Sequence, residues 1–138
     1  MSRYRAREEA FKTVFQYGFS PEIDIEELIA QAEGGEDAPE FDDELDYYED
    51  TVRGVVKNLE KIDADIERFS TGWSHNRISR VARAIMRISV YEMTGRCDIS
   101  AGVSINEAVE LAKKYADDET GAFVNGLLGA FVRDRESN

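Results

Sequence analysis

The stretch "VSINEAVELAKKY", residues 103–115, sets the fold class of the chain. Its apolar residues recur every three or four positions, from Ile105 through Ala108 to Ala112, which is the spacing of one face of an α-helix. Residues 104–107 have the serine and glutamate of a capping box, which is typical of a helix N-terminus. We therefore predict a helix that begins after Ser104 and buries this apolar face.

Further helices are expected on both sides of this stretch, because apolar residues keep the helical spacing along most of the chain. They are expected roughly over residues 4–17 and 77–93, between Ser20-Pro21 and Gly34-Gly35, around residues 45–59, after an N-cap at Asp63, and around residues 123–131. Strict alternation of apolar and polar residues, the mark of a strand, is nearly absent. The sequence therefore predicts an all-α bundle of about seven helices, built as one domain over residues 1–138.

The net charge of −12 is concentrated in one segment. Residues 21–50 hold fourteen acidic and no basic side chains, whereas the rest of the chain has a net charge of +2. Residues 34–42, "GGEDAPEFD", are expected to form an acidic loop. A charge of −12 argues against nonspecific affinity for nucleic acid, but a local basic surface remains compatible with it.

Such a surface is suggested at the start of the chain, where Arg3, Arg5 and Arg7 occupy alternate positions. Cations are unfavourable at a helix N-terminus because of the helix dipole, and an anionic ligand would reverse that cost. The arginines therefore predict a phosphate-binding arm. The alternative is a frayed, solvated terminus whose arginines form salt bridges with the acidic segment.

Residue types that carry catalysis are scarce. His75, near Trp73, is the single histidine and Cys97 the single cysteine, and neither belongs to a metal-binding or nucleophile motif. We therefore expect no enzyme activity, metal or cofactor. One free cysteine fits a reducing cytoplasm, and no stretch approaches the ~20 apolar residues of a membrane span.

The first expected helix has more aromatic residues than one buried face needs. Phe15 and Phe19, four residues apart, fall at the edge of that face. They are either core residues or part of a hydrophobic patch for a partner protein.

Three stretches, with Ile62-Asp63 and Trp73 between them, together resemble one known family. They are "RYRAREEAFKTVFQ" (3–16), "RAIMRISVYEM" (83–93) and "VSINEAVELAKKYADDETGAFVNGLL" (103–128), and they are similar to the NusB transcription antitermination factors. The resemblance implies a seven-helix RNA-binding fold without catalysis. It also implies binding of single-stranded boxA RNA from ribosomal RNA leaders together with a ribosomal small-subunit protein, called NusE in this role. The pair helps RNA polymerase resist termination, and some members form homodimers that cover the RNA surface.

The resemblance also implies roles for particular residues. The residues matching the RNA-contacting positions are Arg3, Arg5, Arg7, Lys113, Lys114 and Glu119. The residues matching positions at or near the partner interface are Phe15, Phe19 and Ala82, the last replacing a frequent acidic residue. Tyr4 stands where members often have a further basic residue.

Two other functions are weighed against this one. The chain could be a helical protein-interaction module without a direct RNA role, in which the acidic segment binds a basic protein. It could also resemble the RNA-binding domain fused to ribosomal RNA methyltransferases, but 138 residues leave no room for a methyltransferase domain.

Overall fold

The computed structural model describes residues 1–70 and 78–137, which fold into seven α-helices and a short 3₁₀ turn, with no strand among them. The elements are α1 (Arg3–Phe19), α2 (Ile25–Gly34), η1 (Asp42–Glu44), α3 (Leu45–Lys57), α4 (Leu59–Ser70), α5 (Arg80–Gly95), α6 (Ala101–Tyr115) and α7 (Asp118–Ser137). The all-α prediction is confirmed. Trp73 and His75 lie outside the described residues.

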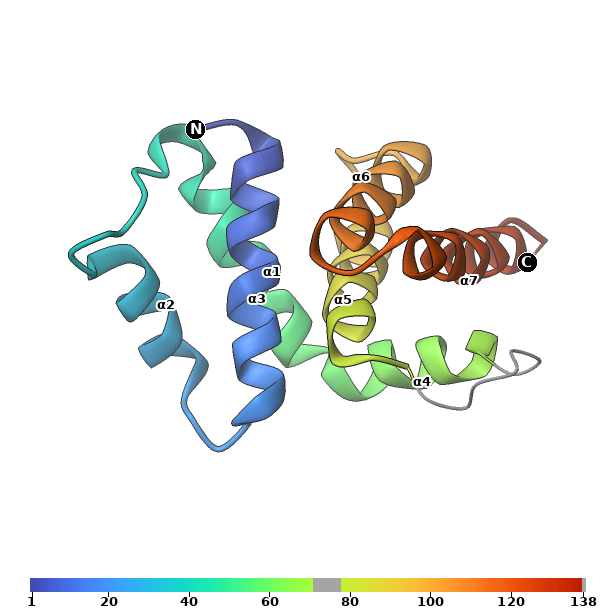
Figure 1. Cartoon of the computed structure of the whole chain (residues 1–138), viewed down its shortest axis with the longest axis horizontal. Coiled ribbons are helices and arrows are strands. Elements are labelled where there is room, and N and C mark those ends of the chain that lie inside the picture. The colour runs from blue at the N-terminus through green and yellow to red at the C-terminus, as the bar shows by residue number, and fades with distance from the viewer. Residues whose placement is uncertain (71–77, 138) are drawn as a thin grey trace.

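The helices form two groups that meet along α5 (Figure 1). In one group, α1, α2 and α3 pack against one another; in the other, α6 packs on α5 and α7. The α4 helix follows α3 and contacts both α5 and α7. Because α1 also packs directly on α5, the first helix of the chain is fixed against the C-terminal group.

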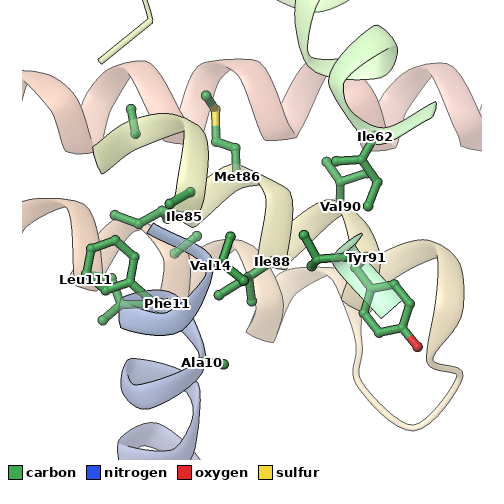
Figure 2. Close-up of a cluster of buried hydrophobic side chains, with 14 of the residues drawn as sticks. Ala10, Phe11, Val14, Ile62, Ile85, Met86, Ile88, Val90, Tyr91 and Leu111 are labelled. Atoms are coloured by element: carbon green, nitrogen blue, oxygen red, sulfur yellow. The ribbon is translucent and has the colours of Figure 1, made fainter. Parts of the chain in front are cut away.

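The buried side chains that join the groups come from α1, α5 and α6 (Figure 2). Phe11 and Val14 of α1 meet Ile85 and Ile88 of α5, and Leu111 of α6 completes the cluster. Each side chain is almost fully buried, and burying one such side chain contributes about 1.5–3 kcal/mol. This packing sets the angle at which the start of α1 approaches α6.

Serine or aspartate side chains cap the starts of α1, α2, α5 and α6, two of them at positions other than those expected. The α2 helix begins after Asp24, whose carboxylate accepts a hydrogen bond from the Glu26 amide at 3.1 Å, so the predicted start at Ser20-Pro21 is wrong. The α6 helix begins after Ser100, which caps the Val103 amide at 3.3 Å. The capping box at Ser104 is therefore also wrong, because this serine lies inside the helix and is buried.

The predicted N-cap at Asp63 is wrong as well, because α4 begins four residues earlier, at Leu59. Asp63 instead lies within α4 and accepts two hydrogen bonds from Arg87 of α5, each 2.8 Å. The predicted end of the second helix is confirmed: α2 ends at Gly34, with Gly35 as its C-cap.

The acidic segment is packed on the bundle. Leu28 and Ile29 of α2 are buried, and Phe41, in the loop between α2 and η1, packs against Tyr48 of α3 with ring centroids 4.5 Å apart. The amino terminus contacts Asp42 at 3.1 Å. This places part of the acidic segment next to the start of α1.

Candidate nucleic-acid interface

The start of α1 and the end of α6 meet around one carboxylate, that of Glu8. Its side chain is 3% exposed and accepts hydrogen bonds from Arg5 at 2.9 Å, from the Tyr115 hydroxyl at 2.8 Å and from the Lys114 ammonium. Arg5 also contacts Glu9 at 3.1 Å. Residues more than one hundred positions apart in sequence are thereby held on one surface.

The carboxylate of Glu8 remains charged and holds the two cations in place. Burial alone would raise the pKa of Glu8, but the hydrogen bonds from Lys114, Tyr115 and Arg5 outweigh that effect and lower its pKa to about 2. The hydrogen bond to Glu8 in turn raises the pKa of Lys114. Glu8 pairs with both cations and Glu9 pairs with Arg5 as well, so two carboxylates fix Arg5 and Lys114 at the surface. Both side chains are about half exposed.

Two aromatic rings flank Lys114. Its ammonium nitrogen lies 5.8 Å from the ring centroid of Tyr4 and 5.5 Å from that of Tyr115, both within the range of a cation–π interaction. We call Tyr4, Arg5, Glu8, Lys114 and Tyr115 the α1–α6 surface. It combines cations with aromatic rings, a combination typical of sites for single-stranded nucleic acid.

The remaining residues expected to contact RNA lie at different places. Lys113 is exposed in the last turn of α6, its side chain passing over Gly121, and Glu119 is exposed in the first turn of α7. Arg3 turns toward α3, where it pairs with Glu44 at 2.6 Å and covers the ring of Tyr47 at 4.3 Å. The alternative of a salt bridge to the acidic segment is thus realised for Arg3.

Arg7 does not belong to an exposed arm, so that expectation is wrong for this residue. It is 3% exposed and pairs with Glu92 of α5 at 2.7 Å. The Glu92 carboxylate also accepts hydrogen bonds from Tyr47 and Ser104, and its side chain is fully buried. A phosphate could reach the Arg7 guanidinium only if this network opened. We call Arg7, Tyr47, Glu92 and Ser104 the buried network.

A second exposed feature lies at the other end of α1. Phe15 is half-buried and Phe19 is 53% exposed; their rings meet edge to face with centroids 4.9 Å apart. The guanidinium of Arg80, at the start of α5, lies 4.4 Å from the Phe19 ring centroid. A hollow of about 310 Å³, lined by residues that include Phe15 and Arg80, runs between α1 and α5.

Ala82 lies in the first turn of α5 and is only 2% exposed. Its side chain packs in the core, and its amide is capped by Ser79 at 3.1 Å. The Ala82 side chain therefore offers no surface contact of its own, and its place at or near a partner interface stays a prediction. Arg80, two positions before Ala82, is exposed at this end of α5.

Sequence reasoning missed Glu8 and Tyr115 as members of the α1–α6 surface and Glu92 and Ser104 as partners of Arg7. The i, i+3 spacing of Arg5 and Glu8 was a local signal for one ion pair. The contacts across 106 and 85 positions follow from helix packing and have no local signal.

The described residues contain no group of three or more histidine, cysteine or carboxylate side chains placed to hold a metal ion. Within the same residues, no helix combines the length and the apolar character that crossing a membrane requires.

Comparison with known proteins gives a consistent result. A model described as the NusB family matches residues 4–133. A transcription antitermination protein NusB from Acetivibrio thermocellus is 47% identical over 136 residues, covering 96% of this chain and 90% of its own length. The corresponding protein from Thermoanaerobacter sp. strain X514 is 44% identical over 134 residues, covering 97% and 92%.

Solved structures agree. NusB from T. maritima superposes with a TM-score of 0.79 at 34% identity, over 96% of this chain and 92% of its own. A chain from a structure of the antitermination factors NusB and NusE in complex with dsRNA gives a TM-score of 0.81 at 30% identity, over 97% and 99%.

Proposed function

The chain belongs to the NusB family, and we propose that it acts in transcription antitermination as a non-catalytic RNA-binding adaptor. It binds boxA-type leader RNA of ribosomal transcripts together with NusE, in the cytoplasm and as part of the RNA polymerase complex. Relatives that carry the antitermination name cover nearly the whole chain. A similar chain has been solved in a complex of NusB and NusE with dsRNA.

The α1–α6 surface is the observation that carries this proposal. Its cations come from two helices and are held by a buried carboxylate before any ligand arrives. A preorganised pair loses less side-chain entropy on binding than two free chains would. Both side chains remain about half exposed, so their remaining N–H groups are open to the phosphate oxygens of an RNA strand.

The two ends of α1 allow RNA and a protein partner to bind at the same time. At 1.5 Å per residue, the fourteen positions from Arg5 to Phe19 span about 20 Å. Phe19 and Arg80 offer an exposed aromatic ring and a cation at the far end, which suits a protein interface. We assign this end to NusE, and RNA to the α1–α6 surface.

Fluorescence anisotropy tests the proposal. A labelled single-stranded boxA-type RNA and a scrambled control are titrated with the chain, with and without NusE, at two salt concentrations. We expect a preference for boxA, enhanced by NusE and weakened by salt. Tight binding of NusE with no preference between the RNAs would instead support the protein-interaction module.

Single substitutions locate the RNA site. Arg5→Ala and Lys114→Ala should each weaken RNA binding and reduce the salt slope by about 0.7, the value for one phosphate on a single strand. Lys61→Ala removes an exposed lysine of α4 that is paired with Asp65, so this control should leave both quantities unchanged. If Arg5→Ala and Lys114→Ala both bind RNA with unchanged affinity, RNA does not bind at the α1–α6 surface.

A further inference from the structure

Tyr4 is unusual among the aromatic residues of the described chain. Most of them are buried or half-buried, whereas Tyr4 is 37% exposed in the first turn of α1. Phe19, the other exposed aromatic residue, belongs to the opposite end of the same helix. Each end of α1 therefore presents one ring to solvent.

The surroundings of Tyr4 are cationic. The Lys114 ammonium lies 5.8 Å from its ring centroid and is held there by Glu8. Arg5, the next residue in the chain, is held by the same carboxylate. An exposed ring next to one fixed cation, with a second cation held by the same carboxylate, has the composition of a nucleotide site, in which the base meets the ring and the phosphates meet the cations.

We propose that Tyr4 is the stacking surface for one unpaired base of the RNA, with Lys114 and Arg5 on the flanking phosphates. This inference rests on the proposed function and adds a means of selecting among RNAs. The faces of a base inside a duplex are covered by its neighbours, whereas a single strand can turn a base onto an aromatic ring. Tyr4 therefore favours single-stranded RNA over a duplex of the same sequence.

The proposal also explains what a tyrosine, rather than a basic residue, contributes at position 4. A tyrosine exchanges a phosphate contact for a base contact. Stacking involves no release of counterions, so the affinity that Tyr4 supplies should be insensitive to salt, unlike that of its two neighbours.

The test compares Tyr4→Ala, Tyr4→Leu and Tyr4→Phe in the full chain, by anisotropy with a single-stranded boxA-type RNA and with a blunt duplex of the same sequence. We expect Tyr4→Ala and Tyr4→Leu to weaken single-strand binding about tenfold with an unchanged salt slope. Tyr4→Phe should restore most of the affinity, because it keeps the ring. Binding to the duplex should not change in any of the three.

Val103→Ala provides a matched control, since Val103 is an exposed apolar residue at the other end of α6, and it should bind as the unmodified chain does. Circular dichroism melting checks that each variant is folded.

If the unmodified chain prefers boxA RNA but Tyr4→Ala and Tyr4→Leu match it, the stacking role is overturned while the proposed function stands. A reduced salt slope in Tyr4→Ala would overturn it too, because the ring would then act only by positioning Lys114. An unmodified chain without RNA preference overturns the proposed function and this inference together.

Discussion

Arg5 and Arg7 stand two positions apart on α1 and have opposite surroundings. Arg5 is half-exposed beside Glu8 and Glu9, whereas Arg7 points into the protein and pairs with Glu92. Two positions on a helix correspond to a rotation of about 200°, so alternate arginines cannot share a face. The basic arm predicted from the sequence therefore contains one surface residue, Arg5, and one structural residue, Arg7.

Replacing Arg7 should destabilise the fold far more than replacing Arg5. Arg7→Ala leaves the Glu92 carboxylate buried without its cation, a change that costs about 3–5 kcal/mol. Arg5→Ala removes exposed ion pairs and should cost about 1 kcal/mol or less. Urea unfolding followed by circular dichroism measures both values. A loss below about 1 kcal/mol for Arg7→Ala would show that the buried network does not hold the helices together.

Glu8 should make stability depend on acid pH. Its pKa is lowered to about 2 in the folded chain, below the value near 4.3 of an unfolded glutamate. The stabilisation is therefore complete above about pH 4.3 and is lost as the pH falls toward 2. The free energy of unfolding, measured between pH 6 and 2.5, should fall less steeply in Glu8→Gln. Parallel curves for the two proteins would contradict the hydrogen-bonded state of Glu8.

Among the helices, α3 and α5 make a close contact at Gly54. A Cβ at this position would lie 2.1 Å from the Tyr91 ring, and the Tyr91 hydroxyl is fixed to Asp50 at 3.0 Å. The hydrogen bond to Asp50 therefore keeps the Tyr91 ring from moving away from position 54. A glycine that lowers helix propensity by about 1 kcal/mol is retained here because it allows two helices to approach.

Gly54→Ala should therefore destabilise the fold by about 1–3 kcal/mol in spite of its higher helix propensity. Gly129→Ala is the matched control in the interior of α7, where a Cβ meets only the end of the flexible Arg133 side chain at 3.3 Å. That variant should gain about 1 kcal/mol. Thermal melting of both distinguishes the two effects, and equal melting temperatures would contradict the close contact.

Helix existence could be predicted from the sequence, but helix starts and long-range partners could not. The apolar spacing of residues 4–17 and 77–93 corresponds to α1 and α5, because burial imposes that spacing. The serine and glutamate of residues 104–107 fit a capping box, yet Ser104 donates to Glu92 from inside α6 at 2.8 Å. A short sequence pattern shows that a serine is present, but it does not show whether its partner is a free backbone amide at a helix start or a buried carboxylate on another helix.

Part of the candidate site could likewise be predicted from the sequence, and part could not. The sequence and its family resemblance point to Arg5 and Lys114, and the structure holds both on one carboxylate. The burial of Arg7 and Ala82 could not be predicted, because it depends on where α5 lies against α1. Which side chains are exposed depends on how the helices pack, and helical spacing alone does not determine it.

At the scale of the whole molecule, the acidic segment adjoins the RNA surface that we propose. The amino terminus contacts Asp42, and Arg3 is neutralised by Glu44 of η1. The fold thus keeps one of the three opening arginines occupied by its own acidic segment. Negative charge near the start of α1 also repels phosphates within about a Debye length.

Glu44→Gln should release Arg3 and strengthen RNA binding a few-fold at low salt, because one cation is freed and one anion is lost. The gain should disappear at about 0.5 M salt, where exposed charges are screened. Glu60→Gln, a change of the same kind on α4, provides the control. Anisotropy at both salt concentrations gives the comparison, and an unchanged affinity at low salt would show that Arg3 plays no part in RNA binding.

The most direct test of the account is to map the RNA on the protein. Amide chemical shifts of the isotope-labelled chain are followed by NMR as single-stranded boxA-type RNA is added, first alone and then with NusE. We predict that RNA shifts the amides of residues 2–9 and 113–120, and that NusE shifts a separate set around Phe15, Phe19 and Arg80. RNA shifts centred on the Phe19 end of α1, with residues 2–9 unmoved, would contradict the assignment of RNA to the α1–α6 surface.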